Sequence, residues 1–446
     1  MIRRSPRFLL AGRRGFATFL VLWVVGLAGV VIIAVQSAAL AEAVEGRESL
    51  ARVRAYWAAR GGVESTIARL GYATENPDLT DAFTILDDLT DAAEGRFDGA
   101  LYRISFTDEG EEVLGPADGH AKINVNRMTR EGLLLLPYMT EDVADSILDW
   151  IDDDDDSNPL GAEVGFYQSL PFGYEPRNAP MRTPHELELV AGSYDAYVRG
   201  EDWNLNARLD PNEDDGDDSW PPDDADGKLD GGWSGLLTAL SVDDVLTPSG
   251  EARLDLKTAA ASDVQQRTGI SREHSDVIVN YVAASANASM RDFIRSNLSA
   301  LIQAAGNNPQ TTPGSSPLTN EEMTRLLDEC GIGAEEPGPR PGKLNINTCA
   351  AETLQYLPGL DPAIADSIVV ARDSRPEGFT SVVGLIDAGV VSRAQLARIY
   401  DLITVRSNVY VVSSRGRDAA TGLEVEIIAT LDRSTLPVTI SDLVIR

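Results

Sequence analysis

An unbroken apolar run from Phe16 to Val35 constrains the fold of this chain more than any other feature. The run is 20 residues long and carries no charge, so as a helix it would span a hydrocarbon core of about 30 Å. Five arginines and no acid precede it, and basic residues hold such a leader on the cytoplasmic side. A cleaved signal peptide is disfavoured, because the run is long and no small-residue cleavage site ends it. We expect a membrane-spanning helix.

The residues after this run predict that the helix continues outside the membrane. Residues 36–70 contain no proline, and their apolar positions recur at steps of three and four. These positions include Leu40, Val44, Leu50, Val53, Tyr56 and Trp57. One helix of roughly 55 residues and ~80 Å follows, half in lipid and half outside.

The junction between the basic leader and the apolar run resembles the cleavage site of a type IV pilin-like precursor. The resemblance implies that a prepilin peptidase cuts after Gly15 and that the new amine, on Phe16, is methylated. Most members of that family carry Glu at the fifth mature position, where this chain has Leu20. A Glu there neutralises the buried amine of a neighbouring subunit, since an unpaired charge in an apolar bundle is costly. A plain signal anchor is the alternative.

Charge balance and the scarcity of reactive side chains narrow the functional classes. Asp and Glu total 70 against 38 Lys and Arg, a formal charge of −32, and so acidic a surface repels nucleic acid and anionic lipid. Only 3 histidines occur, and no serine nucleophile motif is present, so we expect no enzyme. Cys330 and Cys349 would be free to form a disulfide in an oxidising periplasm, and buried free thiols are the alternative.

Strand-like and helical patterns divide the rest of the chain. Alternating segments at 100–106, 409–413, 423–431 and 437–445 predict strands, whereas 121–405 is mostly helical in pattern. We expect an α+β fold: a pilin-like long helix, a small antiparallel sheet from both chain ends, and a large inserted helical domain. The predicted segments are a leader (1–15), the helix (16–35 and 36–72), the first part of the sheet (73–120), helical units (121–200, 234–305 and 343–407), an acidic segment (201–233), linkers with a short helix (306–342) and the closing strands (408–446).

The helical region contains an internal repeat. Residues 343–368 align without gaps on residues 122–147, KLNINTCAAETLQYLPGLDPAIADSI on KINVNRMTREGLLLLPYMTEDVADSI, with 11 of 26 positions identical. A weaker middle copy begins at Arg253. Each copy predicts a strand-like Asn-apolar-Asn opening, a helix, a tight turn and a second helix, and Gly359 suits the turn of the last copy. This pattern resembles the helix-hairpin-helix unit.

Helix-hairpin-helix units often bind DNA through turn amides and nearby Lys or Arg. Here Asp361 and Asp366 flank the last turn, and Tyr138 replaces the turn glycine in the first copy. We therefore expect a packing scaffold rather than a DNA site.

Further motifs resemble the K-type minor pseudopilin of type II secretion. They are Asp149-Trp150-Ile151-Asp152, Gly161-Ala162-Glu163, Pro176-Arg177-Asn178-Ala179-Pro180 and Glu186-Leu187-Glu188-Leu189-Val190. The absence of Glu at position 20 is typical of the same subunit. The acidic segment 201–233 and the middle copy look like additions to this pattern.

The acidic segment contains a match to a calcium-binding loop. Residues 202–213, DWNLNARLDPNE, place oxygen ligands at loop positions 1, 3, 5, 9 and 12. These ligands are Asp202, Asn204, Asn206, Asp210 and Glu213, with the backbone carbonyl of Arg208 at position 7. Ala207 stands where such a loop expects glycine, and Pro221 and Pro222 prevent a helix from following directly. Asp224, Asp226, Gly227 and Asp230 repeat half of the pattern, and a solvated acidic loop is the alternative for both.

The run from Asp152 to Asp156 is a second candidate for calcium. Adjacent carboxylates repel one another unless a cation or solvent screens them. A closed loop between Trp150 and Tyr167 would bring together Asp152, Asp154, Asp156 and Glu163, and the K-type resemblance implies calcium there. The alternative is a helix end that dissolves into a solvated turn.

Together these features imply a K-type minor pseudopilin at the tip of a type II secretion pseudopilus. Such a subunit takes part in starting pseudopilus assembly and in protein export across the outer membrane. We expect a single-pass protein of the bacterial inner membrane with its head in the periplasm and calcium as its cofactor. The expected partners are the prepilin peptidase, the major pseudopilin and other minor pseudopilins, with no nucleic acid. The alternative is a membrane-anchored periplasmic DNA receptor of the competence type.

Overall fold

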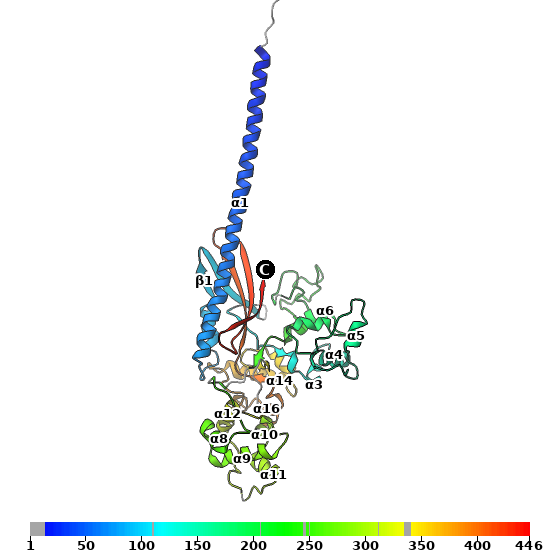
Figure 1. Cartoon of the computed structure of the whole chain (residues 1–446), viewed down its shortest axis with the longest axis vertical. Helices are drawn as coiled ribbons and strands as arrows, with labels where there is room; N and C mark the ends of the chain where they lie inside the picture. Colours follow the sequence, from blue (N-terminus) through cyan, green and yellow to red (C-terminus); the bar gives the residue numbers. More distant parts are fainter. Residues whose placement is uncertain are drawn as a thin grey trace, which may run out of the picture.

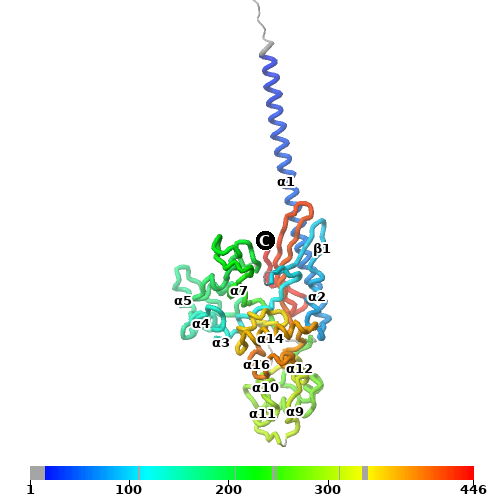
Figure 2. Tube along the Cα trace, turned by 180° about the vertical axis from the view of Figure 1, so that it is seen from behind, coloured from blue at the N-terminus to red at the C-terminus, as the bar shows by residue number. Residues whose placement is uncertain are grey.

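The computed structural model describes residues 14–108, 111–205, 207–243, 247–248, 250–310, 312–333 and 340–446. A long helix extends from one end of the molecule, and its second half lies against a sheet (Figure 1). The helical region lies on the side away from the free end of that helix (Figure 1, Figure 2). The architecture is α+β, as predicted.

One continuous helix, α1 (Arg14–Glu75), carries both the apolar run and the segment after it. From Phe16 to Leu50 no residue is buried within the chain, and Ala51 is the first that packs. Within the described residues, α1 alone is long and apolar enough to cross a membrane, judged by length and composition. The prediction of one helix is confirmed, over 62 residues.

Small side chains let the second half of α1 approach the sheet closely. Ala51, Ala55 and Ala59 are at most 2% exposed. A Cβ on Gly416, in β13 (Val409–Asp418), would overlap the carbonyl oxygen of Ala55. Because a larger side chain at these places would push helix and sheet apart, the alanine-rich surface determines how the two pack.

The sheet is antiparallel throughout, with the strand order β1-β2-β13-β14-β15, β3 beside β2 and β4 beside β13. The pairing of β2 (Ala100–Asp108) with β13 joins the two ends of the chain. The other strands are β1 (Glu94–Phe97), β3 (Glu111–Leu114), β4 (Ala117–Asp118), β14 (Glu424–Asp432) and β15 (Thr439–Ile445). All four predicted strand segments lie in this sheet.

The helical region contains three copies of one frame, each closed by a short parallel strand pair. The pairs are β5 (Ile123–Asn124) with β6 (Leu237–Thr238) in the first copy, β8 (Leu254–Asp255) with β9 (Cys330–Gly331) in the middle copy, and β11 (Leu344–Asn345) with β12 (Ile403–Thr404) in the last copy. The opening strands are the repeated segments that the sequence predicted. The closing segments also correspond, LTALS at 237–241 to ITVRS at 403–407.

Short helices fill the three frames and the connections between them. Before the first copy comes α2 (Thr84–Asp91). The first copy has η1 (Val125–Arg127), α3 (Arg130–Leu133), α4 (Glu141–Ile151), α5 (Val164–Gln168), η2 (Pro184–Leu189), α6 (Asp195–Arg199) and α7 (Gly232–Leu236). The middle copy has α8 (Ala261–Thr268), α9 (Arg272–Ala284), α10 (Met290–Arg295), α11 (Leu298–Ala304) and α12 (Asn320–Glu329). The last copy has α13 (Ala351–Gln355), α14 (Pro362–Asp373), α15 (Gly384–Asp387) and α16 (Arg393–Ile399). Between copies, β7 (Val242–Asp243) pairs with β10 (Arg340–Pro341).

The second asparagine of the opening segment clamps the start of the second hairpin. In the last copy, Asn347 Nδ2 donates to Phe379 O at 2.9 Å, and Phe379 N donates to Asn347 Oδ1 at 2.8 Å. In the first copy Asn126 makes the same two bonds with Met181, at 2.9 and 2.7 Å. A side-chain amide suits this place because it donates and accepts at once.

The first asparagine reaches the closing strand in the same two copies. Asn345 Nδ2 donates to Ser407 Oγ at 2.9 Å, and Asn124 Nδ2 donates to Ser241 Oγ at 3.0 Å. The middle copy has Asp255 at this position, which accepts from the backbone N of Lys257 and Gly333. The Asn-apolar-Asn motif is therefore a structural closure for the first and last copies.

Three hydrophobic clusters hold the molecule together. One is built mainly from the first and last copies, a second belongs to the middle copy, and the third joins α1 to the sheet. Cys349 lies in the first and Cys330 in the second, and both are free thiols. The disulfide considered from the sequence does not form, because the two thiols are buried in separate clusters. The core of the middle copy reaches Cys330, beyond the predicted end of that unit at 305.

Candidate cation-binding sites

The first copy differs from the last by two inserted segments. In the first copy, residues 152–180 connect α4 to Met181, the residue held by the Asn126 clamp. In the last copy, the corresponding connection from α14 to Phe379 needs only residues 374–378. The second inserted segment, residues 200–231, connects α6 to α7. In the last copy, residues 400–402 are enough to connect α16 directly to the closing strand β12. Most of the ligands predicted from the sequence lie in these two segments.

Three carboxylates converge where α4 ends and the first inserted segment begins. Asp149 lies in the last turn of α4, Asp152 follows that helix, and Glu163 precedes α5. One oxygen from each lies within 4.8 Å of the others, and among the described residues no other His, Cys, Asp or Glu group is so arranged. Asp149 is fully buried, Glu163 is 7% exposed and Asp152 is half-buried.

Four oxygens of this group receive no hydrogen bond: Asp149 Oδ2, Asp152 Oδ1 and both oxygens of Glu163. Asp149 Oδ1 is held separately, by Asn158 N at 3.0 Å and Asn158 Nδ2 at 2.6 Å. Burial, with Asp149 and Asp152 beside it, raises the pKa of Glu163 to about 7. Burial and the nearby Asp154 and Asp149 also raise the pKa of Asp152. Buried carboxylate oxygens without donors are costly, so the group is suited to a hard cation.

The composition of this group differs in part from the prediction. Asp152 and Glu163 belong to it, but Asp154 and Asp156 have exposed side chains and do not join it. Asp154 Oδ1 instead accepts from Asp156 N at 2.8 Å. Asp149 was not among the predicted ligands. Its spacing of three residues from Asp152 at a helix end is the signal that could have found it.

The predicted calcium loop buries its first and last ligands. Asp202 and Glu213 are 5% and 1% exposed. Glu213 Oε1 accepts from Trp203 N at 3.2 Å, and its Oε2 accepts from Asp210 N at 3.1 Å. Burial raises the pKa of Glu213, and the charges of Asp202 and Asp210 raise it further. Both oxygens of Glu213 thus face the interior of the loop.

The middle of the loop adopts the turn that such a site requires. Ala207 takes the left-handed conformation, at φ 55°, where a calcium loop normally has glycine. Its backbone N donates to Asp202 Oδ2 at 2.9 Å. Asn204 Nδ2 donates to Asp210 Oδ2 at 2.7 Å, which brings positions 3 and 9 together. Asn206 lies outside the described residues.

Arg208 directs its side chain away from the loop and onto the sheet. Its Nη2 donates to Ser413 Oγ in β13 at 3.2 Å, and the guanidinium pairs with Glu426 in β14. Only the backbone carbonyl of Arg208 is then left for a cation. The acidic segment is thereby tied to the pilin-like body.

The downstream partial repeat of the calcium-loop pattern, residues 224–230, is more exposed to solvent. The side chains of Asp224, Asp226 and Asp230 are exposed. The Glu201 carboxylate accepts from the backbone N of Asp224 at 3.2 Å and of Asp230 at 3.1 Å. This arrangement is that of a solvated turn.

The predicted processing site lies at the start of α1. The helix includes Gly15 and Phe16, and the leader residues before Arg14 lie outside the described residues. Phe16 is 72% exposed and Leu20 is 49% exposed within this chain.

The features described define a class of protein. A long helix with an unpacked apolar half lays its other half on an antiparallel sheet, and a helical domain is inserted between the strands of that sheet. This is a pilin-like body with one candidate membrane helix.

Comparison with known families identifies two parts of the inserted domain. Residues 121–199 match the family described as type II secretion system (T2SS), protein K, and residues 341–404 match the helix-hairpin-helix motif. The match at residues 121–199 confirms, for that part of the chain, the resemblance to the type II secretion protein K family inferred from the sequence.

Among solved structures, the chain is similar to one in the crystal structure of the GspK-GspI-GspJ complex from the enterotoxigenic Escherichia coli type 2 secretion system. The two are 12% identical with a TM-score of 0.39, and the match covers 90% of this chain and 99% of the other. No curated protein sequence matches the chain.

Proposed function

We propose that this chain is a minor pseudopilin at the tip of a type II secretion pseudopilus, where it takes part in starting assembly and in protein export. The observation that carries the proposal is the position of the protein K domain. Residues 121–199 are inserted into a helix-and-sheet body whose α1 is able to cross a membrane. The first copy lies beside the sheet and the middle copy lies beyond it, away from the free end of α1, where their bulk would obstruct a further subunit (Figure 2).

The side chain at position 20 supports the tip position. A subunit inside a helical bundle needs a carboxylate there to neutralise the amine of its neighbour, because an unpaired charge is costly in an apolar environment. Leu20 supplies none. The tip is the place in such an assembly where no further amine has to be neutralised.

Amino-terminal processing tests the pilin-like part of the proposal. The chain would be held in the inner membrane with its head in the periplasm, cut after Gly15 and methylated on Phe16. Mass spectrometry of membrane-extracted protein should find N-methyl-Phe16 as the first residue, and Gly15→Asp should leave the leader attached. An intact Met1, or a cut after residue 35, contradicts the proposal.

Abundance and partners test the tip position. We expect the chain to co-purify with other minor pseudopilins and at far lower abundance than the major pseudopilin. Quantitative mass spectrometry of sheared pseudopili measures both. Leu20→Glu should still insert into the membrane, since the added carboxyl group can stay neutral there. Recovery along the whole pseudopilus at the abundance of the major subunit would exclude the tip.

We also propose calcium as the cofactor of the inserted domain. Support comes from the four unpaired carboxylate oxygens around Asp149 and from the turn at Ala207 between Asp202 and Glu213. Both places offer oxygen ligands alone, which hard cations prefer. Calcium fits better than magnesium because it accepts irregular geometry and sheds its water more readily. A bound calcium ion would hold each of the two inserted segments folded by drawing its carboxylates together.

The helix-hairpin-helix match favours a DNA receptor as a second candidate. Against it, the Asp361 side chain accepts from Ile364 N at 2.9 Å, so an amide near the last turn already has an anionic partner. Titration of duplex DNA at low salt separates the candidates. Submicromolar binding with a steep dependence on salt would favour the receptor.

A further inference from the structure

The middle copy contains a groove at the end of the molecule farthest from the free end of α1 (Figure 1). Helix α9, the end of α11 and the residues Asn307, Thr312 and Pro313 enclose a volume of about 330 Å³. Pockets for small ligands and side chains begin near this size, about 300 Å³. Neither family match includes these residues, since one ends at 199 and the other begins at 341.

The groove has apolar side chains at its buried base and acidic side chains at its more exposed rim. Val277 and Ile302 are 4% and 3% exposed and belong to the core of the middle copy. Glu273 is exposed, and Asp276 lies three residues along the same face of α9. The amide of Asn280 adds a polar group one turn further on. An apolar floor beneath two carboxylates is complementary to a side chain with a long aliphatic stem and a cationic head.

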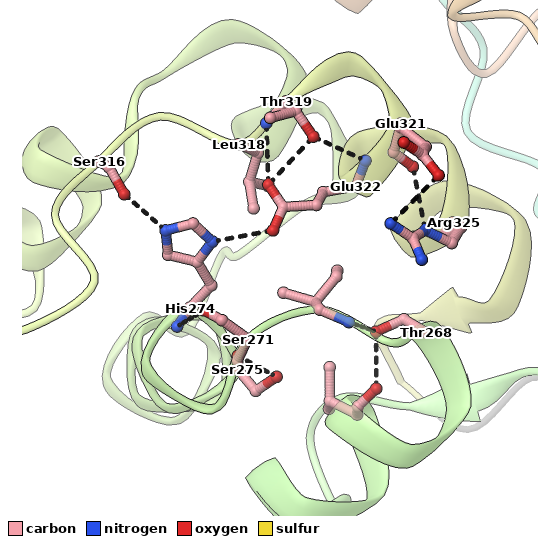
Figure 3. Close-up of polar contacts among 12 residues, drawn as sticks. Thr268, Ser271, His274, Ser275, Ser316, Leu318, Thr319, Glu321, Glu322 and Arg325 are labelled. Carbon is pink, nitrogen blue, oxygen red and sulfur yellow. Dashed lines mark hydrogen bonds and ion pairs between the residues drawn. The ribbon is translucent and has the colours of Figure 1, made fainter.

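The loop that forms the other wall is held in place by a polar network around His274, shown in Figure 3. His274 Nε2 lies 2.8 Å from Ser316 Oγ, and His274 Nδ1 lies 3.3 Å from Glu322 Oε1. Ser299 Oγ, in α11, donates to Ser315 O at 2.8 Å. These contacts tie the residues after Pro313 to α9, α11 and α12. The groove is thus preformed, which lowers the entropic cost of binding.

We propose that this groove binds an arginine or lysine side chain presented by an extended segment of a partner protein. The carboxylates of Glu273 and Asp276 would pair with the cationic head, while Val277 and Ile302 would contact its stem. Arg272 already pairs with Asp276 at 3.3 Å, but both side chains are about half exposed, so this surface contact is weak and can be displaced. The formal charge of −32 attracts basic partners over a distance. A protein partner fits better than a lipid headgroup because the groove lies at the opposite end from the apolar half of α1.

The test uses the full chain in detergent and a fluorescent peptide, acetyl-Gly-Arg-Gly-Arg-Gly-amide, with binding followed by anisotropy. The same peptide with citrulline in place of arginine keeps the shape and removes the charge. We expect the arginine peptide to bind more tightly than the citrulline peptide. Glu273→Gln should weaken the arginine peptide by about 3-fold, as expected for a partly exposed ion pair. Ala305, next to the end of α11, lines the groove, so Ala305→Phe should fill it and abolish the difference between the peptides.

The matched control is Glu321→Gln. Glu321 is also an exposed glutamate in the first turn of a helix of the middle copy, α12, and its substitution changes the charge by the same amount outside the groove. It should leave peptide binding unchanged. Equal binding of the two peptides overturns the proposal. So does an equal loss in Glu273→Gln and Glu321→Gln, because attraction to the whole acidic surface would then explain it. Unchanged thermal unfolding confirms that each variant is folded.

Discussion

The first and last copies close the same frame around very different lengths of chain. In both, an opening strand pairs in parallel with a closing strand, and an asparagine clamps the second hairpin. The last copy does this between 343 and 407. The first copy carries residues 152–180 and 200–231 in addition, and still returns to the same two contacts.

The difference shows how an inserted segment can be held without a core of its own. Between Val198 and Trp233 the described residues add nothing to the hydrophobic cluster, and the buried side chains there include Asp202 and Glu213. The other segment does add Ala162 and Tyr167 to that cluster, and it also buries the polar side chain of Glu163. A bound cation can replace apolar burial in such segments, because it draws together side chains that would otherwise repel.

The two hairpin turns differ in a second way. Gly359 occupies the turn of the last copy at φ +85°, and Tyr138 occupies the same place in the first copy at φ 58°. A left-handed conformation is strained for a bulky residue. Tyr138 compensates by stacking on Tyr197, with ring centroids 5.3 Å apart and planes 9° from parallel.

Removal of an asparagine clamp should have the largest effect. Asn347→Ala leaves Phe379 N and O unpaired in the core, and we expect a loss of about 3 kcal/mol of unfolding free energy. Asn126→Ala should cost less, since Asn126 is only half-buried and water can reach the freed groups. Lys257, the exposed counterpart in the middle copy, is the control, and Lys257→Ala should change little. Denaturant unfolding measures all three, and equal losses would mean that the clamps do not define the frame.

Calcium should stabilise the first copy and not the last. With a Kd of about 10⁻⁴ to 10⁻³ M, 10 mM calcium contributes roughly 1.4 to 2.7 kcal/mol through binding to the folded state. Glu213→Ala removes a bidentate ligand and should lose more of this shift than Asn204→Ala. Magnesium should act less. Thermal unfolding measures the shifts, and an equal shift with sodium at matched ionic strength would reduce the effect to screening.

The carboxylate cluster of Asp149, Asp152 and Glu163 should make the stability of the protein depend on pH when divalent cations are removed by a chelator. The pKa of Glu163 is raised from 4.5 to about 7, so between these values the folded chain holds a proton that the unfolded chain has released. Stability should therefore fall as the pH rises from about 4.5 to about 7. Glu163→Gln or added calcium should flatten this part of the profile, whereas the exposed Glu141→Gln should not. A profile unchanged by Glu163→Gln would contradict the assignment.

Substitutions at the two hairpin turns should have the smallest effects, and the two turns should respond differently. Gly359→Ala places a Cβ in a left-handed conformation and should cost about 1 kcal/mol. Tyr138→Gly relieves a similar strain but loses a stacked ring pair worth about 0.5 to 1.5 kcal/mol, so its net effect should be near zero. Thermal unfolding of the two variants and of the unaltered chain measures both effects as shifts in melting temperature. A large loss in Tyr138→Gly would show that the aromatic stack, rather than the turn, holds the first hairpin.

Local pattern alone determined a large part of this protein. An uncharged run, a proline-free continuation and alternating segments predicted α1 and the four strand segments of the sheet, because helix and strand periodicity is a property of neighbouring residues. The repeat was also visible, since its opening segment, hairpin and Leu-Pro turn lie within 26 consecutive residues.

Only the tertiary structure decided how distant segments meet. Asn126 and Met181 are 55 residues apart, and nothing in either neighbourhood indicates the other. The converse holds for Cys330 and Cys349, which are near in sequence but buried in separate clusters. Asp149 joins Asp152 and Glu163 because α4 ends there and the inserted segment folds back across it. Such contacts depend on how the chain closes long loops and on which polar side chains become buried. The spacing of residues along the sequence contains neither kind of information.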